Sequence, residues 1–74
     1  EPGAVHTVVK LLEDPFYDVR IEAVRALEKI FSKESLAGIE KAMKDSNKNV
    51  RLEAQQAYYS LKNRIEKAEE IKMI

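Results

Sequence analysis

A stretch of fifteen residues occurs twice in this chain. The first copy, EDPFYDVRIEAVRAL, begins at Glu13, and the second, KDSNKNVRLEAQQAY, begins at Lys44, an offset of 31 residues. A period of this length, with short polar breaks between apolar segments, is typical of stacked helix pairs. The repeat therefore restricts the possible fold more than any other feature of the sequence.

The spacing of apolar residues predicts two helices in the first half of the chain. From Ala4 onward, apolar residues recur at i, i+3, i+4 and i+7, which gives a helix one buried face; they are Val5, Val8, Val9 and Leu12. Asp14-Pro15 should end this helix, because proline restricts the residue before it and cannot donate to the next turn. We expect the second helix to begin near Tyr17 or Asp18, with Asp18 as its N-cap.

The second half predicts the same order of elements. A third helix should begin near Ser35, a good N-cap residue, and it contains Gly38, which costs about 1 kcal/mol relative to alanine. A fourth helix should begin near Lys48 or Asn49. No helix breaker follows it, so we expect it to continue to about Lys72.

Short turns between these helices make consecutive helices antiparallel neighbours. We therefore predict an all-α fold, an α-solenoid of two antiparallel helix pairs (four helices) with an extended last helix. One domain should cover residues 1–74, with a first repeat at about 4–33, a second at about 35–63 and a C-terminal helix extension at 64–74. Because the chain begins at Glu1, we expect a trimmed domain, a processed product or a piece of a longer protein.

The pattern L-L-x-D-x-x-x-x-V-R-x-x-A-x-x-A-L resembles the HEAT-like repeat, in particular the short variety of phycobilisome-lyase-like (PBS lyase) proteins. Its matches are Leu11-Leu12, Asp14, Val19-Arg20, Ala23 and Ala26-Leu27, then Ala42-Met43, Asp45, Val50-Arg51, Ala54 and Ala57-Tyr58. The resemblance covers about residues 4 to 63. It implies a structural ladder between repeats, formed by Asp14, Arg20, Asp45 and Arg51. The alternatives are solvated surface charges or a catalytic Asp/Arg pair.

Charge and cysteine content exclude several classes of function. Lysine and arginine number 13, and aspartate and glutamate also number 13, which argues against general affinity for nucleic acid or an anionic membrane. The absence of cysteine removes disulfides, thiolate nucleophiles and sulfur-bound zinc. No apolar run approaches the roughly 20 residues that cross a bilayer. We expect a cytoplasmic protein.

Candidate chemistry is sparse. His6 is the only histidine; it lies off the apolar stripe and has no cysteine or convergent carboxylates nearby, so we interpret it as a surface residue. Some HEAT-like enzymes carry His-Glu metal motifs, but this chain has no His-Glu pair. Two glycines cannot build a phosphate-binding loop. We expect no enzymatic activity, no catalytic residues, no metal and no cofactor.

Five residues lie opposite the predicted buried stripes of the second and fourth helices and form a candidate protein-binding face: Ile21, Arg25, Leu52, Gln56 and Tyr59. The second helices of α-solenoid repeats line the surface that holds partners, and exposed tyrosines often anchor interfaces. The alternative is that these are scattered surface residues, which are normal in soluble proteins.

The flanks of the two repeats differ in polarity. Val9, Val24 and Phe31 in the first repeat correspond to Glu40, Gln55 and Lys62 in the second. Terminal repeats of a solenoid have a polar outer face. The second repeat is therefore typical of a C-terminal cap, and the first is typical of a repeat whose apolar flank packs against a neighbour. That neighbour could be a missing repeat or, in a homodimer, a second copy; otherwise the chain is a self-sufficient monomer.

These observations favour a non-catalytic scaffold segment for protein–protein interaction, within a longer array or protein. Its partner would be another protein or neighbouring repeats, with a homodimer as an alternative, and not a membrane. The rival interpretations are a nucleic-acid-binding HEAT-like module and an accessory segment of a larger lyase-type enzyme. Nucleic-acid binding needs lysine and arginine on one face, whereas here they are interspersed with acids.

Overall fold

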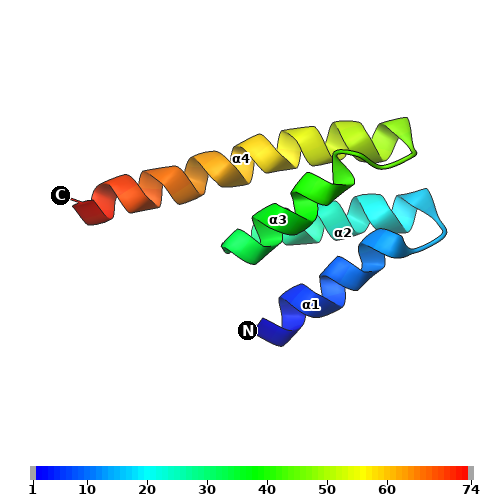
Figure 1. Cartoon of the computed structure of the whole chain (residues 1–74), viewed down its shortest axis with the longest axis horizontal. Coiled ribbons are helices and arrows are strands. Elements are labelled where there is room, and N and C mark those ends of the chain that lie inside the picture. The colour runs from blue at the N-terminus through cyan, green and yellow to red at the C-terminus, as the bar shows by residue number, and fades with distance from the viewer. Residues whose placement is uncertain (1, 74) are drawn as a thin grey trace.

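The computed structural model describes residues 2–73, and the side chains of residues 4–71. Its elements, in chain order, are α1 (Pro2–Lys10), a 3-10 turn η1 (Leu11–Glu13), α2 (Tyr17–Lys29), α3 (Lys33–Ala42) and α4 (Lys48–Met73) (Figure 1). The described residues form helices and turns and contain no strand. The predicted α-solenoid of two antiparallel helix pairs with an extended last helix is confirmed.

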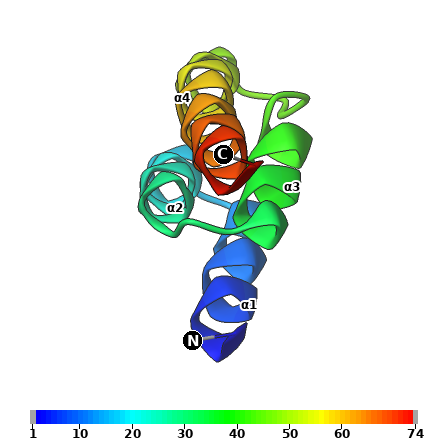
Figure 2. The same cartoon turned by 90° about the vertical axis from the view of Figure 1, so that its left-hand side faces the viewer.

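The helices stack in the order of the chain. Viewed from the end of α4, α2 and α3 lie on either side beneath α4, and α1 lies on the far side from α4 (Figure 2). The molecule measures 45 × 25 × 14 Å. Its long axis follows α4, whose C-terminal part continues beyond the other helices (Figure 1).

A single apolar core joins the two repeats. The apolar side chains with no exposed surface come from three helices: Val24 and Leu27 of α2, Ile39 of α3, and Val50, Ala54 and Leu61 of α4. Ala54 and Ala57 carry small side chains, which let α4 approach its neighbours closely. Neither helix pair can bury its apolar face without the other, so the repeats depend on one another.

Gly38 lies at the closest approach of three helices. A Cβ atom at this position would be 3.2 Å from Leu27 Cδ1 and 3.3 Å from Val9 Cγ2, with Leu12 Cδ1 at 3.7 Å. Glycine thus lets α3 pack tightly against α1 and α2. This close packing explains a glycine inside a helix, where it otherwise weakens the helix.

Two predicted helix caps are wrong. The N-cap of α2 is Phe16, which makes no side-chain cap, and Asp18 lies in the first turn, where its charge favours the helix dipole. Helix α3 begins at Lys33, earlier than expected, because the Ser32 side chain accepts a hydrogen bond from Ser35 N at 3.0 Å. Ser35 is therefore inside the helix and buried. The predicted start of α4 at Lys48 is confirmed, and α4 runs through Met73.

Candidate functional site

An arginine–aspartate contact joins the inter-helix turns of the two repeats. Arg20, in the first turn of α2, donates from Nε to Asp45 Oδ2 at 2.9 Å and from Nη2 to Asp45 Oδ1 at 3.1 Å. Its Nη1 donates to the Asp14 carbonyl at 2.6 Å. The two side chains are only 14% and 11% exposed. This bidentate pair holds the start of α2 in the first repeat against the inter-helix turn of the second repeat.

The Asp45 carboxylate is stabilised in its charged form. Burial raises the pKa of this carboxyl, but the hydrogen bond from Asn47 N at 2.9 Å and the guanidinium of Arg20 lower it more, and Arg51 adds to that effect. The net pKa of Asp45 lies below its ordinary value of 3.8. The pair with Arg20 is therefore fully charged at neutral pH.

Each repeat builds its turn with the same hydrogen bonds. Asp14 Oδ1 accepts from Phe16 N at 2.9 Å, as Asp45 Oδ1 accepts from Asn47 N. Arg51 Nη1 donates to the Asp45 carbonyl at 2.8 Å, as Arg20 Nη1 donates to the Asp14 carbonyl. Among residues 4–71, however, neither the Asp14 carboxylate nor Arg51 has an ion-pair partner.

A second charged cluster lies on the surface between α2 and α4. Arg25 Nη1 is 2.9 Å from Glu22 Oε1 on its own helix, and Arg25 Nε is 3.3 Å from Glu53 Oε2 on α4. The hydrogen bond and charge of Glu53, with those of Glu22, raise the pKa of Arg25. The cluster is exposed, so its contribution to stability is small.

Two large apolar side chains are exposed on α4. Leu52 is 47% exposed and Tyr59 is 63% exposed, and both lie on the side of the helix opposite the buried residues Val50 and Leu61. Gln56 lies between them and is also exposed. We call these three residues, Leu52, Gln56 and Tyr59, the α4 stripe. The Tyr59 ring packs edge-to-face on Tyr58, with ring centroids 5.4 Å apart.

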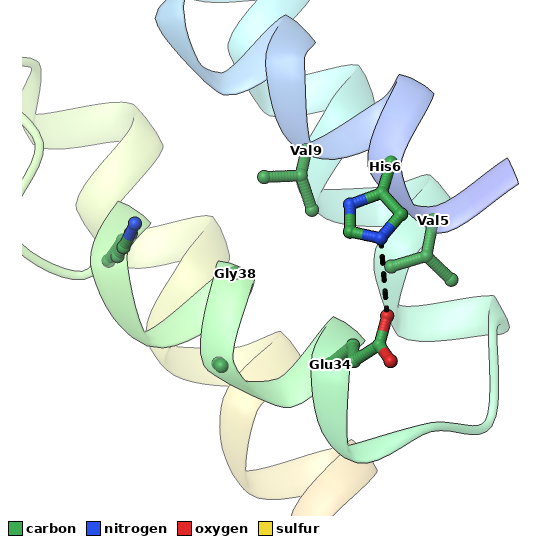
Figure 3. Close-up of a pocket in the computed structure, with 7 residues that line it drawn as sticks. Val5, His6, Val9, Glu34 and Gly38 are labelled. Atoms are coloured by element: carbon green, nitrogen blue, oxygen red, sulfur yellow. Dashed lines mark ion pairs between the residues drawn. The ribbon is translucent and has the colours of Figure 1, made fainter. Parts of the chain in front are cut away.

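A shallow groove separates α1 from α3 (Figure 3). It has a volume of about 220 Å³ and is lined by Val5, His6, Val9, Glu34, Ala37, Gly38 and Lys41. The His6 ring points across it toward Glu34, with 4.0 Å between Nε2 and Oε2, and these side chains are 74% and 64% exposed. Sequence analysis missed this pair, because only the stacking of α1 on α3 brings it together.

The chain was compared with known families and proteins. The sequence model of HEAT repeats matches residues 2–70. The chain belongs to the HEAT repeat family. Curated proteins and solved structures gave no match. Each HEAT repeat is thus one helix pair, α1–α2 or α3–α4, and the Arg20–Asp45 contact links the first HEAT repeat to the second.

Other classes of site find little support among the described residues. In the part of the chain with described side chains, no group of three His, Cys, Asp or Glu residues could hold a metal ion. No described helix combines the length and apolar character needed to cross a bilayer.

The predicted binding face needs one correction. Ile21 is half-buried and packs against the core, so it is not an exposed partner of Leu52 and Tyr59. The second HEAT repeat covers the side of α2 on which Ile21 lies. Its counterpart Leu52 occupies the same position in the second repeat, where no further described helix covers it. Arg25 and Gln56 are exposed, as the sequence predicted.

The flank of Val9, Val24 and Phe31 was predicted to contact either another repeat or a second copy, and the structure divides it. Val24 is fully buried in the core, and Val9 is half-buried with its Cγ2 atom close to Gly38 of α3. Both residues face the second HEAT repeat, so their expected neighbour lies within this chain. Phe31 is 56% exposed and lines a cleft between the α2–α3 turn and α4. On the second repeat, Glu40 and Gln55 are exposed, whereas Lys62 is half-buried and lies over the Tyr58 ring.

Proposed function

We propose that this HEAT repeat chain is a non-catalytic module that binds another protein through the α4 stripe, with Arg25 at the edge of the contact. One observation carries the proposal: Leu52 and Tyr59 are two large apolar side chains, exposed and aligned on one face of a single helix. Scattered single apolar residues are normal on surfaces, but Leu52 and Tyr59 lie in register on one face of a helix, with Gln56 between them.

The chemistry of the stripe suits a protein partner. Tyrosine is enriched among residues that dominate binding energy, because it buries a large ring and still offers a hydroxyl group. The charged cluster of Glu22, Arg25 and Glu53 lies beside the stripe and supplies the polar rim that such interfaces have. A leucine and a tyrosine within a polar rim form a small interface of ordinary composition.

The same charges argue against a nucleic-acid partner. Arg20 and Arg25 are held by carboxylates of Asp45, Glu22 and Glu53, so their guanidinium groups are already neutralised. Phosphate binding depends on unpaired positive charge. These two arginines are therefore poor ligands for phosphate, which favours a protein partner at the face that contains Arg25.

The test begins with a photo-crosslinking amino acid at Gln56, introduced into the chain in its source cells, to identify the contacting protein. The dissociation constant of that purified protein is then measured for wild type, Leu52→Ser and Tyr59→Ala. We expect each variant to weaken binding by about tenfold or more, since each removes a central apolar contact. Ser60→Ala and Lys67→Ala are matched controls, because they alter exposed residues of α4 outside the stripe.

An unchanged dissociation constant in both Leu52→Ser and Tyr59→Ala would reject the α4 stripe as the binding site. Circular dichroism of each variant verifies that helix content is retained. Because both side chains are exposed and outside the core, we expect neither substitution to unfold the chain.

A further inference from the structure

The contact between the two repeats has an unpaired counterpart on the outer side of each repeat. Within the chain, Arg20 of the first repeat holds Asp45 of the second. At the repeat offset of 31 residues, Arg51 of the second repeat corresponds to Arg20 of the first. Asp14 of the first repeat corresponds to Asp45 of the second. Among residues 4–71, neither Arg51 nor the Asp14 carboxylate forms an ion pair; Arg51 acts on the Asp45 carboxylate only through its charge.

Both unpaired groups are already held in the conformation of the internal pair. Arg51 is fixed by bonds from Nη1 to the carbonyls of Asp45 at 2.8 Å and Ser46 at 3.1 Å, which leaves Nε and Nη2 for a carboxylate. Asp14 is fixed by the bond from Phe16 N at 2.9 Å. Both side chains are half-buried. A contact between them would therefore lose little side-chain freedom on forming.

We propose that this chain associates head to tail with a second copy of itself, the first repeat of one copy stacking on the second repeat of the other, with Arg51 donating to Asp14. This association does not rest on the proposed function, but it covers Leu52 and Gln56 of the α4 stripe, so a second copy and a stripe partner would compete for that surface. Its two surfaces are different patches of the same molecule, so the contact is heterologous and can extend beyond a dimer.

Other contacts between the repeats give further complementary counterparts. Arg25 pairs with Glu53 inside the chain, and the corresponding residues on the outer sides are Gln56 and Glu22, an amide and a carboxylate that can hydrogen-bond. Ile21 is covered by the second repeat, and its counterpart Leu52 is an exposed apolar side chain in the matching position. A second copy would cover Leu52 in the way that the core of this chain covers part of Ile21.

Charge around the ladder favours the same arrangement. Glu13 and Asp45 line the same cleft between the repeats, together with Lys41. The counterpart of Glu13 in the second repeat is Lys44, which would lie beside Asp14 of the incoming copy and attract it. In contrast, Val9 and Val24 are replaced by Glu40 and Gln55, so the contact is less apolar than the internal one and should be weak.

The test is sedimentation equilibrium of the whole chain from about 10 µM to about 1 mM, concentrations at which weak association is measurable. We expect wild type to form dimers and larger species as concentration rises. Asp14→Asn keeps the oxygen that accepts from Phe16 N but removes the negative charge. Arg51→Gln removes the guanidinium N–H donors. Each substitution should lower the association constant by about tenfold or more. Glu66→Gln and Lys67→Gln make equal charge changes at exposed positions of α4 and should leave it unchanged.

Mixing the two variants tests the direction of the contact. The Asp14→Asn chain retains Arg51, and the Arg51→Gln chain retains Asp14, so an equimolar mixture should restore dimers but no larger species. High salt should weaken association of wild type, because the contact depends on opposite charges.

A wild-type chain that remains monomeric to about 1 mM would overturn the proposal. So would association that neither Asp14→Asn nor Arg51→Gln weakens, provided that circular dichroism shows both variants folded. If Arg51→Gln unfolds, Asp14→Asn alone decides, since it preserves the turn. Asp14 lies in the first repeat and outside the α4 stripe, so Asp14→Asn should weaken self-association by about tenfold or more and leave binding of a stripe partner intact.

Discussion

At the scale of single residues, two serines three positions apart show how local environment decides the effect of a hydroxyl group. Ser32 precedes α3, and its Oγ caps the helix by accepting from Ser35 N at 3.0 Å. Ser35 is fully buried, and its own Oγ has no hydrogen-bond partner among the described residues. A buried hydroxyl without a hydrogen-bond partner destabilises the folded state, whereas a hydroxyl that caps a helix stabilises it.

These two serines should respond oppositely to alanine. Ser32→Ala should lower the free energy of unfolding by about 1 kcal/mol, because the helix loses its cap. Ser35→Ala should raise it by about 1 kcal/mol, because an unpaired polar group leaves the core and alanine favours the helix. Urea denaturation followed by circular dichroism measures both, with the exposed Ser60→Ala as control. Equal signs for the two variants would contradict this assignment of environments.

The ladder residue Asp45 should make stability depend on acid. Its pKa in the folded state lies below the ordinary 3.8, so the charged pair contributes fully above that pH and its contribution is lost as pH falls toward the folded pKa. The free energy of unfolding should therefore decrease below about pH 4. Asp45→Asn should cost about 1–3 kcal/mol at pH 7 and show less further loss in acid than wild type.

Arg20→Gln provides the matched check on this prediction, because it removes the same pair from the other side. The double variant should cost much less than the sum of the two single variants, since both remove one interaction. Denaturation curves at pH 7 and pH 3 for all four proteins measure the coupling. Strict additivity would show that Arg20 and Asp45 act independently.

At the scale of elements, the extension of α4 binds the end of α2 and the turn that follows it. Arg64 donates to the carbonyl of Glu28, near the C-terminus of α2, where helical carbonyls lack partners. Glu69 lies 3.3 Å from Lys33, the first residue of α3. Ile65 is 8% exposed and lines the cleft beside Phe31. The extension is thus part of the packed structure.

Two isoleucines of α4 test how far that packing reaches. Ile65→Ala should lower the free energy of unfolding by about 2 kcal/mol or more, because it removes buried methyl groups and leaves a cavity. Ile71, six residues further along, is 72% exposed, and Ile71→Ala should change stability by about 0.5 kcal/mol at most. Thermal and urea denaturation measure both. A similar cost for the two would mean that the extension packs uniformly along its length.

At the scale of the whole molecule, the two repeats share one core. Residues from α1, α2, α3 and α4 belong to the same buried cluster, and the Arg20–Asp45 pair crosses between the repeats. Nearest-neighbour stacking of this kind makes each repeat stable only with the other. A chain of two repeats should therefore unfold as one unit.

Substitutions in different repeats test this cooperativity. Leu27→Ala in the first repeat and Leu61→Ala in the second each truncate a fully buried side chain and should cost about 2–5 kcal/mol. Both should shift the whole helical signal in a single transition of the same steepness. Leu52→Ala, at an exposed position, serves as control. Two separated transitions in either variant would show that the repeats unfold independently.

Much of the fold follows from local sequence patterns. The period of 31 residues, the apolar spacing from Val5 to Leu12 and the Asp14-Pro15 break predicted four helices in two pairs, which the structure confirms. The reason is that helix periodicity determines which face of each helix must be buried, whatever covers it. Caps were less predictable, since Ser32 and Ser35 are equally suitable residues and only the path of the turn selects Ser32.

The sequence alone determined the repeat, the helices and the residue types at each turn, because these depend on interactions between residues near one another in the chain. Only the tertiary structure decided which side of each helix faces the next repeat. It buried Val24, half-buried Ile21 and paired Arg20 with Asp45, whereas the exposure of Leu52 and Tyr59 already followed from helix periodicity. The burial and the pairing depend on the direction in which helix pairs stack, and that direction is set by packing between residues about 25 to 36 positions apart, which no local pattern records.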